Sequence, residues 1–413
     1  MKVLFLSQIV PFPPHGGVLQ RGYNIVREIA GRHELHLLAF VHPDILRTPA
    51  EVEQSCSVLR GFCKSVEYFD LWPKRSRLDR VLAIGAGLAL PEPFSVIAHR
   101  SAAFARRIRE VVSEEKIDVV HYDTIALARF MDCAAGVPSV LTHHNIESQL
   151  MARRAAVERW PASAYLAMQT RKLVTYEKSM SPRFDVNVMM SDLDAEALRQ
   201  LAPGVETAVV PNGVDVSYFS PGDGPEEAAM IYTGGMNMFA NRDAVMHFVD
   251  HIWPTVKAAR PDARFDIVGQ DPPAELLQRA QRDPGLKIHG YVDDIRPLVK
   301  RAAVYVVPIR VGGGTRLKVL DALAQGKAIV STAVGCEGIQ VTDRKDVLIE
   351  DESATFARQV VALLNDPARR RELGAAAREL AESQYAWGPI GARLAKAYER
   401  AIDLRRAATG RAA

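Results

Sequence analysis

The chain has 413 residues, 48% of them hydrophobic and 24% charged, which predicts a folded protein of two domains with about 200 residues each. Its formal net charge of +3 is too small to indicate a nucleic-acid partner, and we expect none. The four cysteines show neither metal-type CxxC spacing nor a disulfide framework, which predicts reduced thiols in a cytoplasmic protein. Pro11 cuts the first apolar stretch short, so a strand is predicted there and not a signal peptide.

Short apolar strands alternate with longer amphipathic segments, which is typical of parallel sheets covered by helices on both faces. A single long helix is predicted from about Glu147 to Met180, and a break rich in Pro and Gly follows Pro211. The same alternation begins again after this break, so two doubly wound halves are predicted. The predicted strands are 2–7, 35–40, 66–69, 118–121, 139–143, 186–190, 230–233, 265–268, 287–289, 304–307 and 328–331.

The loop after the predicted strand 304–307 is the strongest candidate for a ligand site, because open parallel sheets bind ligands beyond the carboxyl ends of their strands. Pro308 ends this strand, and Thr315 is a suitable cap for a helix that stops at Gly326. Bare backbone amides that lead into a helix N-terminus make an anion site. The glycines and basic residues of this loop and helix are Gly312, Gly313, Gly314, Arg310, Arg316 and Lys318.

The helix after this loop is apolar around most of its circumference and is therefore predicted to be buried. Lys318 and Asp321 share its one polar strip, either for function or as a structural Lys–Asp pair. A carboxylate one turn beyond a phosphate site is well placed to accept both hydroxyls of a ribose. Arg316 and Lys318 can neutralise a diphosphate and stabilise it as a leaving group. The implied ligand is a nucleoside diphosphate that carries another group.

This segment resembles the donor-binding region of retaining GT-B glycosyltransferases, in particular glycosyltransferase family 4, and a subgroup that assembles exopolysaccharide or cell-surface glycans. The family holds the donor ribose with a Glu at the position of Asp321, while its earlier Glu falls on Gly313 here. The resemblance implies an α/β fold of the GT-B type, with two Rossmann-like doubly wound parallel-sheet domains facing a central cleft. It implies an acceptor-side domain over 1–210, a nucleotide-sugar donor domain over 211–385, and a helix over 386–413 that packs back on the first domain.

Further loops of the second half match the family in order. Gly234 and Gly235 match the first loop of its donor domain, although the basic pair often found there for the pyrophosphate is missing. That role therefore goes to Arg316 and Lys318, with Arg310 in reserve. The resemblance places the backbone of Gly290, Tyr291 and Val292 against the nucleobase. It places Glu337 near the hydroxyls of the sugar, with a plain turn as the alternative.

Two loops of the first half are candidates for the sugar side of the site. Gly16 and Gly17 precede a helix and let the backbone approach a phosphate or sugar, unless they form an ordinary tight turn. The resemblance places His144 beside the transferred sugar, with a solvated histidine as the alternative. His121 and Asp123 end another strand and are weaker candidates on the acceptor side.

The predicted activity is transfer of a sugar from a nucleoside-diphosphate sugar to a glycan or lipid-linked acceptor, with retention at the anomeric carbon and a role in surface polysaccharide synthesis. The nucleotide sugar is a co-substrate, and neither a further cofactor nor a metal is expected. A sugar-nucleotide epimerase of the same fold and a non-catalytic sugar-nucleotide-binding subunit remain as alternatives. A nicotinamide-dependent dehydrogenase is disfavoured, because the loop at Gly16 and Gly17 lacks GxGxxG spacing.

A basic stretch, 74–80, precedes the apolar stretch 81–90, which is too short to cross a bilayer. The combination resembles a surface patch that docks on anionic lipid, although charge runs are more often simply solvated. The sequence therefore predicts a cytoplasmic protein with a candidate peripheral contact at the inner face of the membrane.

Overall fold

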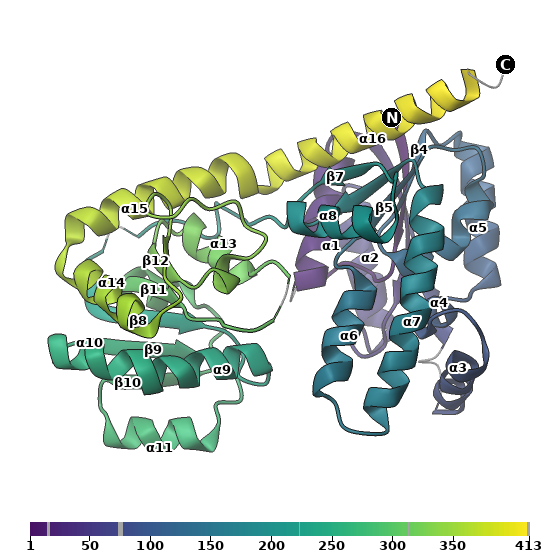
Figure 1. Cartoon of the computed structure of the whole chain (residues 1–413). Coiled ribbons are helices and arrows are strands. Elements are labelled where there is room, and N and C mark those ends of the chain that lie inside the picture. Colours follow the sequence, from purple (N-terminus) through teal and green to yellow (C-terminus); the bar gives the residue numbers. More distant parts are fainter. Residues whose placement is uncertain (15–16, 73–76, 223, 313, 411–413) are drawn as a thin grey trace. The chain divides into compact units, whose positions relative to one another are not determined.

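The structure is a computed structural model that describes residues 1–14, 17–72, 77–222, 224–312 and 314–410. The chain forms two compact units (Figure 1). Unit 1 comprises Met1–Pro211 together with the chain from Ile390 onward, and unit 2 comprises Asn212–Pro389. Each unit contains its own parallel sheet.

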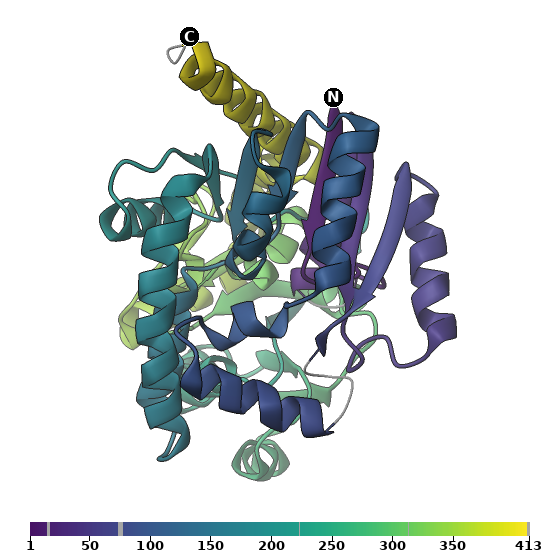
Figure 2. The same cartoon turned by 90° about the vertical axis from the view of Figure 1, so that its right-hand side faces the viewer.

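Unit 1 is built on a seven-stranded parallel sheet in the order β3-β2-β1-β4-β5-β6-β7. The central strands are continuous apolar runs, because helices cover both of their faces. Figure 2 shows α2 (Pro49–Arg60) beside β3 at the outer edge of this sheet. The strands are β1 (Lys2–Ser7), β2 (Glu34–Val41), β3 (Ser65–Asp70), β4 (Val119–Tyr122), β5 (Ser139–His143), β6 (Val186–Met189) and β7 (Thr207–Val209).

The long helix predicted over 147–180 is wrong, because the structure has two helices there. The first ends before Glu158, whose backbone is extended, and the second begins after Pro161, which has no N–H to continue the first. The two helices pack against each other as a hairpin. These two helices are α6 (Glu147–Val157) and α7 (Ala162–Met180). Besides these and α2, the described helices of unit 1 before Pro211 are α1 (Gly17–Ala30), α3 (Arg77–Ala89), α4 (Phe94–Ala98), α5 (Ala102–Glu115), η2 (Ile125–Ala134), η3 (Ser181–Arg183) and α8 (Asp192–Leu201).

Unit 2 repeats this architecture with a six-stranded parallel sheet in the order β10-β9-β8-β11-β12-β13. Its core combines the apolar strand residues with one face of each covering helix, including fully buried Tyr232, Tyr305 and Phe248. The strands are β8 (Glu227–Thr233), β9 (Arg264–Val268), β10 (Leu286–Gly290), β11 (Ala302–Val307), β12 (Ala328–Ser331) and β13 (Leu348–Ile349).

The helix predicted to start near Thr315 begins two residues later, with Arg316 as its N-cap residue and no side-chain cap. Thr315 therefore lies in the loop, not at the cap. The last helix, α16, begins at Trp387 in unit 2 and continues through unit 1. The helices of unit 2 are α9 (Phe239–His247), η4 (Phe248–Ile252), α10 (Trp253–Ala259), α11 (Ala274–Arg282), α12 (Arg296–Arg301), α13 (Leu317–Ala324), η5 (Val334–Cys336), α14 (Ser353–Asn365), α15 (Pro367–Leu380), η6 (Ala381–Tyr385) and the start of α16 (Trp387–Gly410).

All four cysteines are free thiols. Cys56, Cys63 and Cys336 are buried and Cys133 is half-buried. Burial raises the pKa of Cys63 to about 12 and that of Cys336 to about 11, so these thiols stay protonated at neutral pH.

Candidate functional site

Glycines at the ends of β8 and β9 bring bare backbone together at the carboxyl edge of the sheet in unit 2. Gly234 has a φ of +153° and donates its N–H to Val268 O at 2.8 Å. A Cβ on Gly269 would overlap the carbonyl of Gly234, and a Cβ on Gly234 would fall on the ammonium of Lys318. Residues with a side chain are therefore excluded at Gly234 and Gly269. The bare backbone of Gly234 and Gly235 lies beside Lys318.

Lys318 and Asp321 do not form the structural pair that the sequence left open. Lys318 lies in the first turn of α13, and its Nζ donates to Tyr232 Oη and to Asn241 Oδ1, each at 2.8 Å. Within the described part of the chain, the side chain of Asp321 makes no hydrogen bond and no ion pair. A carboxylate held on an otherwise buried helix without a partner is available to hydroxyl donors from a ligand.

Burial perturbs both charged groups of α13 in the direction that neutralises them. It lowers the pKa of Lys318 to about 7; Arg316 lowers it further, and Asp321 opposes the shift. Burial also raises the pKa of Asp321 to about 7, against the effect of Lys318. A ligand that brings negative charge to Lys318 and hydroxyl groups to Asp321 would restore the charged form of each.

The loop between β11 and α13 contains the remaining basic candidates. Arg310 is held by an ion pair in which its Nη2 lies 2.7 Å from Asp243 Oδ1, so its charge is already compensated by that carboxylate. Gly312 and Gly314 have φ values of +114° and +80°, which favour glycine, while Gly313 lies outside the described residues. This loop therefore combines glycine-specific backbone with the N-terminal end of a buried helix, an arrangement suited to phosphate.

Two further predicted loops lie at the same edge of the sheet, because they follow β10 and β12. Gly290 has a φ of +64°, and its carbonyl accepts from the N–H of Gly269. Tyr291 is exposed and Val292 is half-buried. Glu337 is half-buried directly after η5.

The candidates of unit 1 lie at the carboxyl ends of β4 and β5. His144 Nε2 lies 3.3 Å from Asp123 Oδ1, and the Asp123 side chain is buried. His121 is held from two sides: its Nδ1 lies 2.8 Å from Tyr398 Oη of α16, and its Nε2 lies 3.0 Å from Thr142 Oγ1. His121 is thus part of the packing between β4 and α16, whereas Asp123 and His144 directly follow the ends of β4 and β5.

Burial keeps the histidines beneath this pair neutral. It lowers the pKa of His121 to about 3 and that of His143 to about 4, because neither ring can be charged in the core. Gly17 opens α1 in the same unit and is exposed, while Gly16 lies outside the described residues. Gly17, His121, Asp123 and His144 therefore belong to unit 1, and the other predicted site residues within the described ranges belong to unit 2.

Sequence reasoning missed the residues that position Lys318, and it missed one buried arginine of unit 1. Tyr232 and Asn241, which bind Lys318, lie 86 and 77 residues away from it in sequence. Arg21 on α1 is buried and donates to the carbonyls of Val210 and Pro211 at 2.9 and 2.6 Å. A basic residue on the apolar face of an amphipathic helix was the available signal for Arg21.

One group of side chains within the described residues is spaced like a set of metal ligands, namely Glu34, His36 and Glu115 at the amino end of β2. Lys2 Nζ lies 3.5 Å from Glu34 Oε1 and 3.6 Å from Glu115 Oε2. Because Lys2 bridges the two carboxylates, this group is accounted for as an ion-pair cluster. Within unit 1 it also lies at the amino edge of the sheet, opposite to the carboxyl edge where Asp123 and His144 follow their strands.

Comparison with known sequences gives two family matches that together span most of the chain. Residues 15–218 match Glycosyltransferase Family 4, and residues 227–366 match Glycosyl transferases group 1. The GDP-mannose-dependent alpha-(1-6)-phosphatidylinositol monomannoside mannosyltransferase of Mycolicibacterium smegmatis is 25% identical over 363 residues, or 81% of this chain and 87% of that protein. The corresponding monoacylated-substrate enzyme of Corynebacterium glutamicum is 28% identical over 206 residues, or 45% of this chain and 54% of that protein. The chain thus spans about half the length of this second relative.

Solved structures share the fold at low sequence identity. Sucrose-phosphate synthase from Thermosynechococcus elongatus superposes with a TM-score of 0.65 at 16% identity, over 98% of this chain and 100% of that chain. The Anabaena protein HepE in complex with UDP superposes with a TM-score of 0.65 at 15% identity, over 96% and 99%. With two Rossmann-like parallel sheets, family matches in both halves and these neighbours, the chain belongs to the glycosyltransferases of family 4 type and is an enzyme with the GT-B fold.

Proposed function

We propose that the protein transfers a sugar from a nucleoside-diphosphate sugar to a glycan or lipid-linked acceptor, with retention at the anomeric carbon, in the synthesis of a surface polysaccharide. One observation carries the proposal. Lys318 and Asp321 lie about one turn apart on α13, next to the backbone of Gly234, and they do not form an ion pair with each other. This arrangement offers separate contacts to a diphosphate and to the adjoining ribose.

In the proposed complex, Lys318 and the backbone amides of the loop before α13 bind the diphosphate, together with Arg316. Asp321 accepts hydrogen bonds from the ribose hydroxyls. During transfer the bond between the anomeric carbon and the diphosphate breaks, and the positive groups stabilise the charge that develops on the leaving oxygen. The acceptor oxygen forms the new bond to the anomeric carbon, and its proton passes to the leaving oxygen of the diphosphate.

Donor binding is tested by a thermal-shift screen of UDP-, GDP- and ADP-sugars on the full chain. At least one nucleotide sugar is expected to stabilise the wild-type protein, and Asp321→Ala is expected to abolish that stabilisation. Asp262→Ala, which removes an exposed carboxylate of the same unit, is the matched control and should retain it. If no nucleotide sugar shifts the wild type, or if Asp321→Ala shifts as the wild type does, the proposed donor site is wrong.

Retention is supported by the resemblance of the donor segment to retaining enzymes and is tested separately. Proton NMR of the first product formed from an α-linked donor should show an α-linked sugar. An inverted product would contradict this part of the proposal. Consumption of the donor without any acceptor, at the full rate, would instead favour an epimerase.

The surface of α3 supports contact of unit 1 with a lipid surface, where a lipid-linked acceptor would be found. Its outward face is apolar: Leu78, Val81 and Leu88 are 67%, 66% and 57% exposed. Its inward face carries a small residue, Gly87, which packs closely on α7: a Cβ on Gly87 would lie 3.0 Å from the hydroxyl of Tyr165. The apolar face of this helix is thus turned away from the core.

Both views place α3 at the same end of unit 1 as the turn between α6 and α7 (Figures 1 and 2). Trp160 in that turn is 82% exposed. In the sequence, the basic stretch 74–80 precedes and opens the helix; residues 74–76 and the side chains of Arg77 and Arg80 lie outside what the structure describes. Apolar side chains next to positive charge are suited to the surface of an anionic bilayer. None of the helices in the described part of the chain has the length and apolar character needed to cross a bilayer.

Lipid contact is tested by co-sedimentation with vesicles that contain 30% phosphatidylglycerol. The wild type is expected to sediment at low salt and to be released at high salt, and Val81→Ser with Leu88→Ser should reduce binding about tenfold. Leu193→Ser with Leu277→Ser removes exposed leucines from other helices and serves as the control. Absence of wild-type binding at low salt would contradict the proposal.

A further inference from the structure

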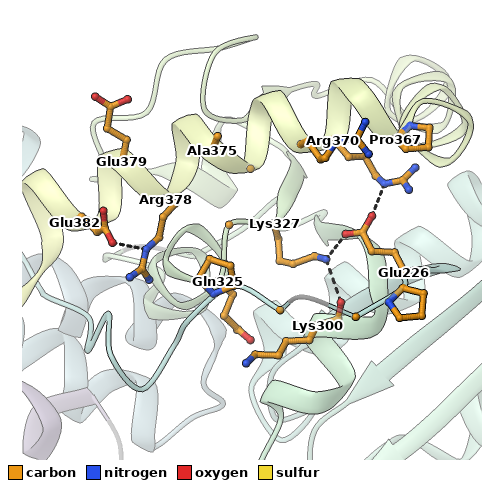
Figure 3. A pocket seen from close by; sticks show the side chains of 17 residues that line it. Glu226, Lys300, Gln325, Lys327, Pro367, Arg370, Ala375, Arg378, Glu379 and Glu382 are labelled. Atoms are coloured by element: carbon orange, nitrogen blue, oxygen red, sulfur yellow. Dashed lines mark hydrogen bonds and ion pairs between the residues drawn. The ribbon is translucent and has the colours of Figure 1, made fainter.

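A cavity of about 690 Å³ lies in unit 2 at the amino ends of the strands, opposite to the candidate donor site (Figure 3). Its walls come from the segment before β8, the end of α12, the turn between α13 and β12, and one face of α15. Its size is within the range of small-molecule sites. No part of the proposed reaction uses it.

One wall of the cavity carries more buried positive charge than its acid can balance. Lys327 and Arg370 are 4% and 9% exposed, and both bind the same carboxylate, Glu226. Lys327 Nζ lies 2.7 Å from Glu226 Oε1, and Arg370 Nε lies 2.8 Å from Glu226 Oε2. Two cations for one carboxylate leave a net charge of one positive unit on a largely desolvated wall, and Lys300 and Arg371 add more at its rim.

A hydrogen-bond acceptor in the same cavity has no donor within the described part of the chain. Gln325 is 2% exposed, and its Oε1 is buried without a hydrogen-bond partner. Its Nε2 donates to the carbonyl of Asp321 at 3.3 Å. Figure 3 shows Gln325 on the wall between Arg378 and Lys300. A buried acceptor left unpaired costs free energy that a hydroxyl group of a ligand would recover.

The other end of the cavity is acidic. Glu379 and Glu382 line it, and Glu382 accepts from Arg378 Nε at 2.7 Å. Arg378 also has a structural role, since it donates hydrogen bonds to the carbonyls of Val216 and Phe219 at 3.0 and 2.9 Å. The cavity therefore offers cations at one end, and acceptors for hydroxyl groups at the middle and the other end.

We propose that this cavity binds a small phosphorylated sugar, with its phosphate among Lys300, Lys327, Arg370 and Arg371 and its hydroxyl groups at Gln325 and the acidic end. A free sugar would leave the positive wall unbalanced. A phosphorylated sugar carries a charged phosphate for the cations and several hydroxyl groups for Gln325 and the carboxylates, so it satisfies both features.

The cavity adjoins the helix that carries the proposed donor site, which gives its occupant a regulatory role. Gln325 is the C-cap residue of α13, and its N–H donates to the carbonyl of Asp321 at 3.1 Å. A Cβ on Gly374 would overlap the carbonyl of Gly326, so the turn after α13 rests directly on α15. A ligand held between Gln325 and α15 fixes the last turn of α13 and with it the position of Asp321. This coupling, unlike the binding itself, rests on the proposed function.

Binding is tested by calorimetry on the full chain with glucose 6-phosphate, glucose 1-phosphate, mannose 6-phosphate, mannose 1-phosphate, glucose and inorganic phosphate as probes. At least one sugar phosphate is expected to bind ten or more times tighter than inorganic phosphate, while glucose should not bind. Lys300→Ala with Arg371→Ala should weaken that binding at least tenfold. Arg282→Ala with Arg358→Ala removes two basic residues that do not line the cavity and should leave it unchanged.

The Asp321→Ala variant separates the two sites. Sugar-phosphate binding that persists in this variant belongs to the cavity, even if the donor site proves wrong. Loss of binding in Asp321→Ala, equal binding of inorganic phosphate, unchanged binding in the Lys300 and Arg371 variant, or no binding by any probe at millimolar concentration would each overturn the site. Coupling predicts that a saturating sugar phosphate changes the affinity for the nucleotide at least fivefold. An unchanged affinity would overturn the regulatory role.

Discussion

The two units place polar side chains at the same edge of the same kind of sheet, but the chemistry of these groups differs. In unit 2 the candidate site contains Lys318 and Asp321, and burial shifts the pKa of each group toward its neutral form. In unit 1 the groups around Asp123 are histidines, the hydroxyl of Tyr398 and one buried cation, Arg21, and the buried rings of His121 and His143 remain neutral. We infer from this contrast that the two units recognise different parts of the substrates. Unit 2 is suited to a highly charged ligand, and unit 1 to a ligand recognised through hydroxyl groups.

The largest effect is expected from Lys318→Met, which removes the ammonium beside the backbone of Gly234 and Gly235 and keeps a side chain of similar length. We expect kcat/KM for the nucleotide sugar to fall by about 10²- to 10³-fold, as for the loss of one group that stabilises developing negative charge. Lys287→Met, at an exposed position of the same unit, is the control. Equal activity of both variants would mean that unit 2 does not bind the diphosphate through Lys318.

The next effect concerns unit 1. His144→Ala should lower kcat by about 10- to 100-fold, the cost of one or two hydrogen bonds to the sugar, and leave the affinity for the bare nucleoside diphosphate unchanged. His251→Ala, an exposed histidine of unit 2, is the matched control. If His144→Ala weakens nucleoside diphosphate binding as strongly as it lowers kcat, the proposed division between the units fails.

The pH dependence of donor affinity gives a further test of unit 2. Diphosphate binding requires protonated Lys318 and ribose binding requires ionised Asp321, and the pKa of each group is about 7. Above pH 7 the ammonium loses its proton and below pH 7 the carboxylate gains one, so affinity should peak near neutral pH. We expect a fall of up to about tenfold per pH unit on each side, measured by calorimetry.

Variants assign the two limbs of this profile. Lys318→Met should lose the alkaline limb, and Asp321→Asn should lose the acid limb. A profile that remains bell-shaped in both variants would place the titrating groups elsewhere.

The smallest effect is expected at the contact between β4 and α16. Tyr398→Phe removes the hydroxyl that bonds His121 and leaves a buried ring nitrogen without a partner, which should cost about 1 to 3 kcal/mol of unfolding free energy in urea. Donor affinity should stay unchanged, because Tyr398 lies in unit 1. Tyr68→Phe, at an exposed tyrosine of the same unit, is the control. A loss of donor affinity without a loss of stability would contradict this assignment.

The sequence predicted the sheets well wherever strands are buried on both faces. Ser139–His143 and Ala328–Ser331 have the predicted bounds, because such strands read as continuous apolar runs. The strands Thr207–Val209 and Leu348–Ile349 were missed, since two or three residues carry no periodicity. The break at Pro161 was also missed, although Pro was the signal for it.

The candidate site was less predictable than the fold. Gly-rich loops and charges at strand ends are local features, so Lys318, Asp321 and His144 could be selected from the sequence. What holds them is not local. Lys318 is oriented by Tyr232 and Asn241, and the His121 ring is held by Tyr398, 277 residues away. Such partners depend on tertiary packing, which spacing alone does not encode.

The buried thiols have a practical consequence for testing the proposed lipid contact by fluorescence. Maleimides react with thiolates, and Cys56, Cys63 and Cys336 are shielded by the core and kept protonated. In a Cys133→Ser background, a fluorophore attached through Leu88→Cys would therefore label one position on α3. Its emission could be followed in real time as vesicles are added, without first removing the three interior sulfur atoms.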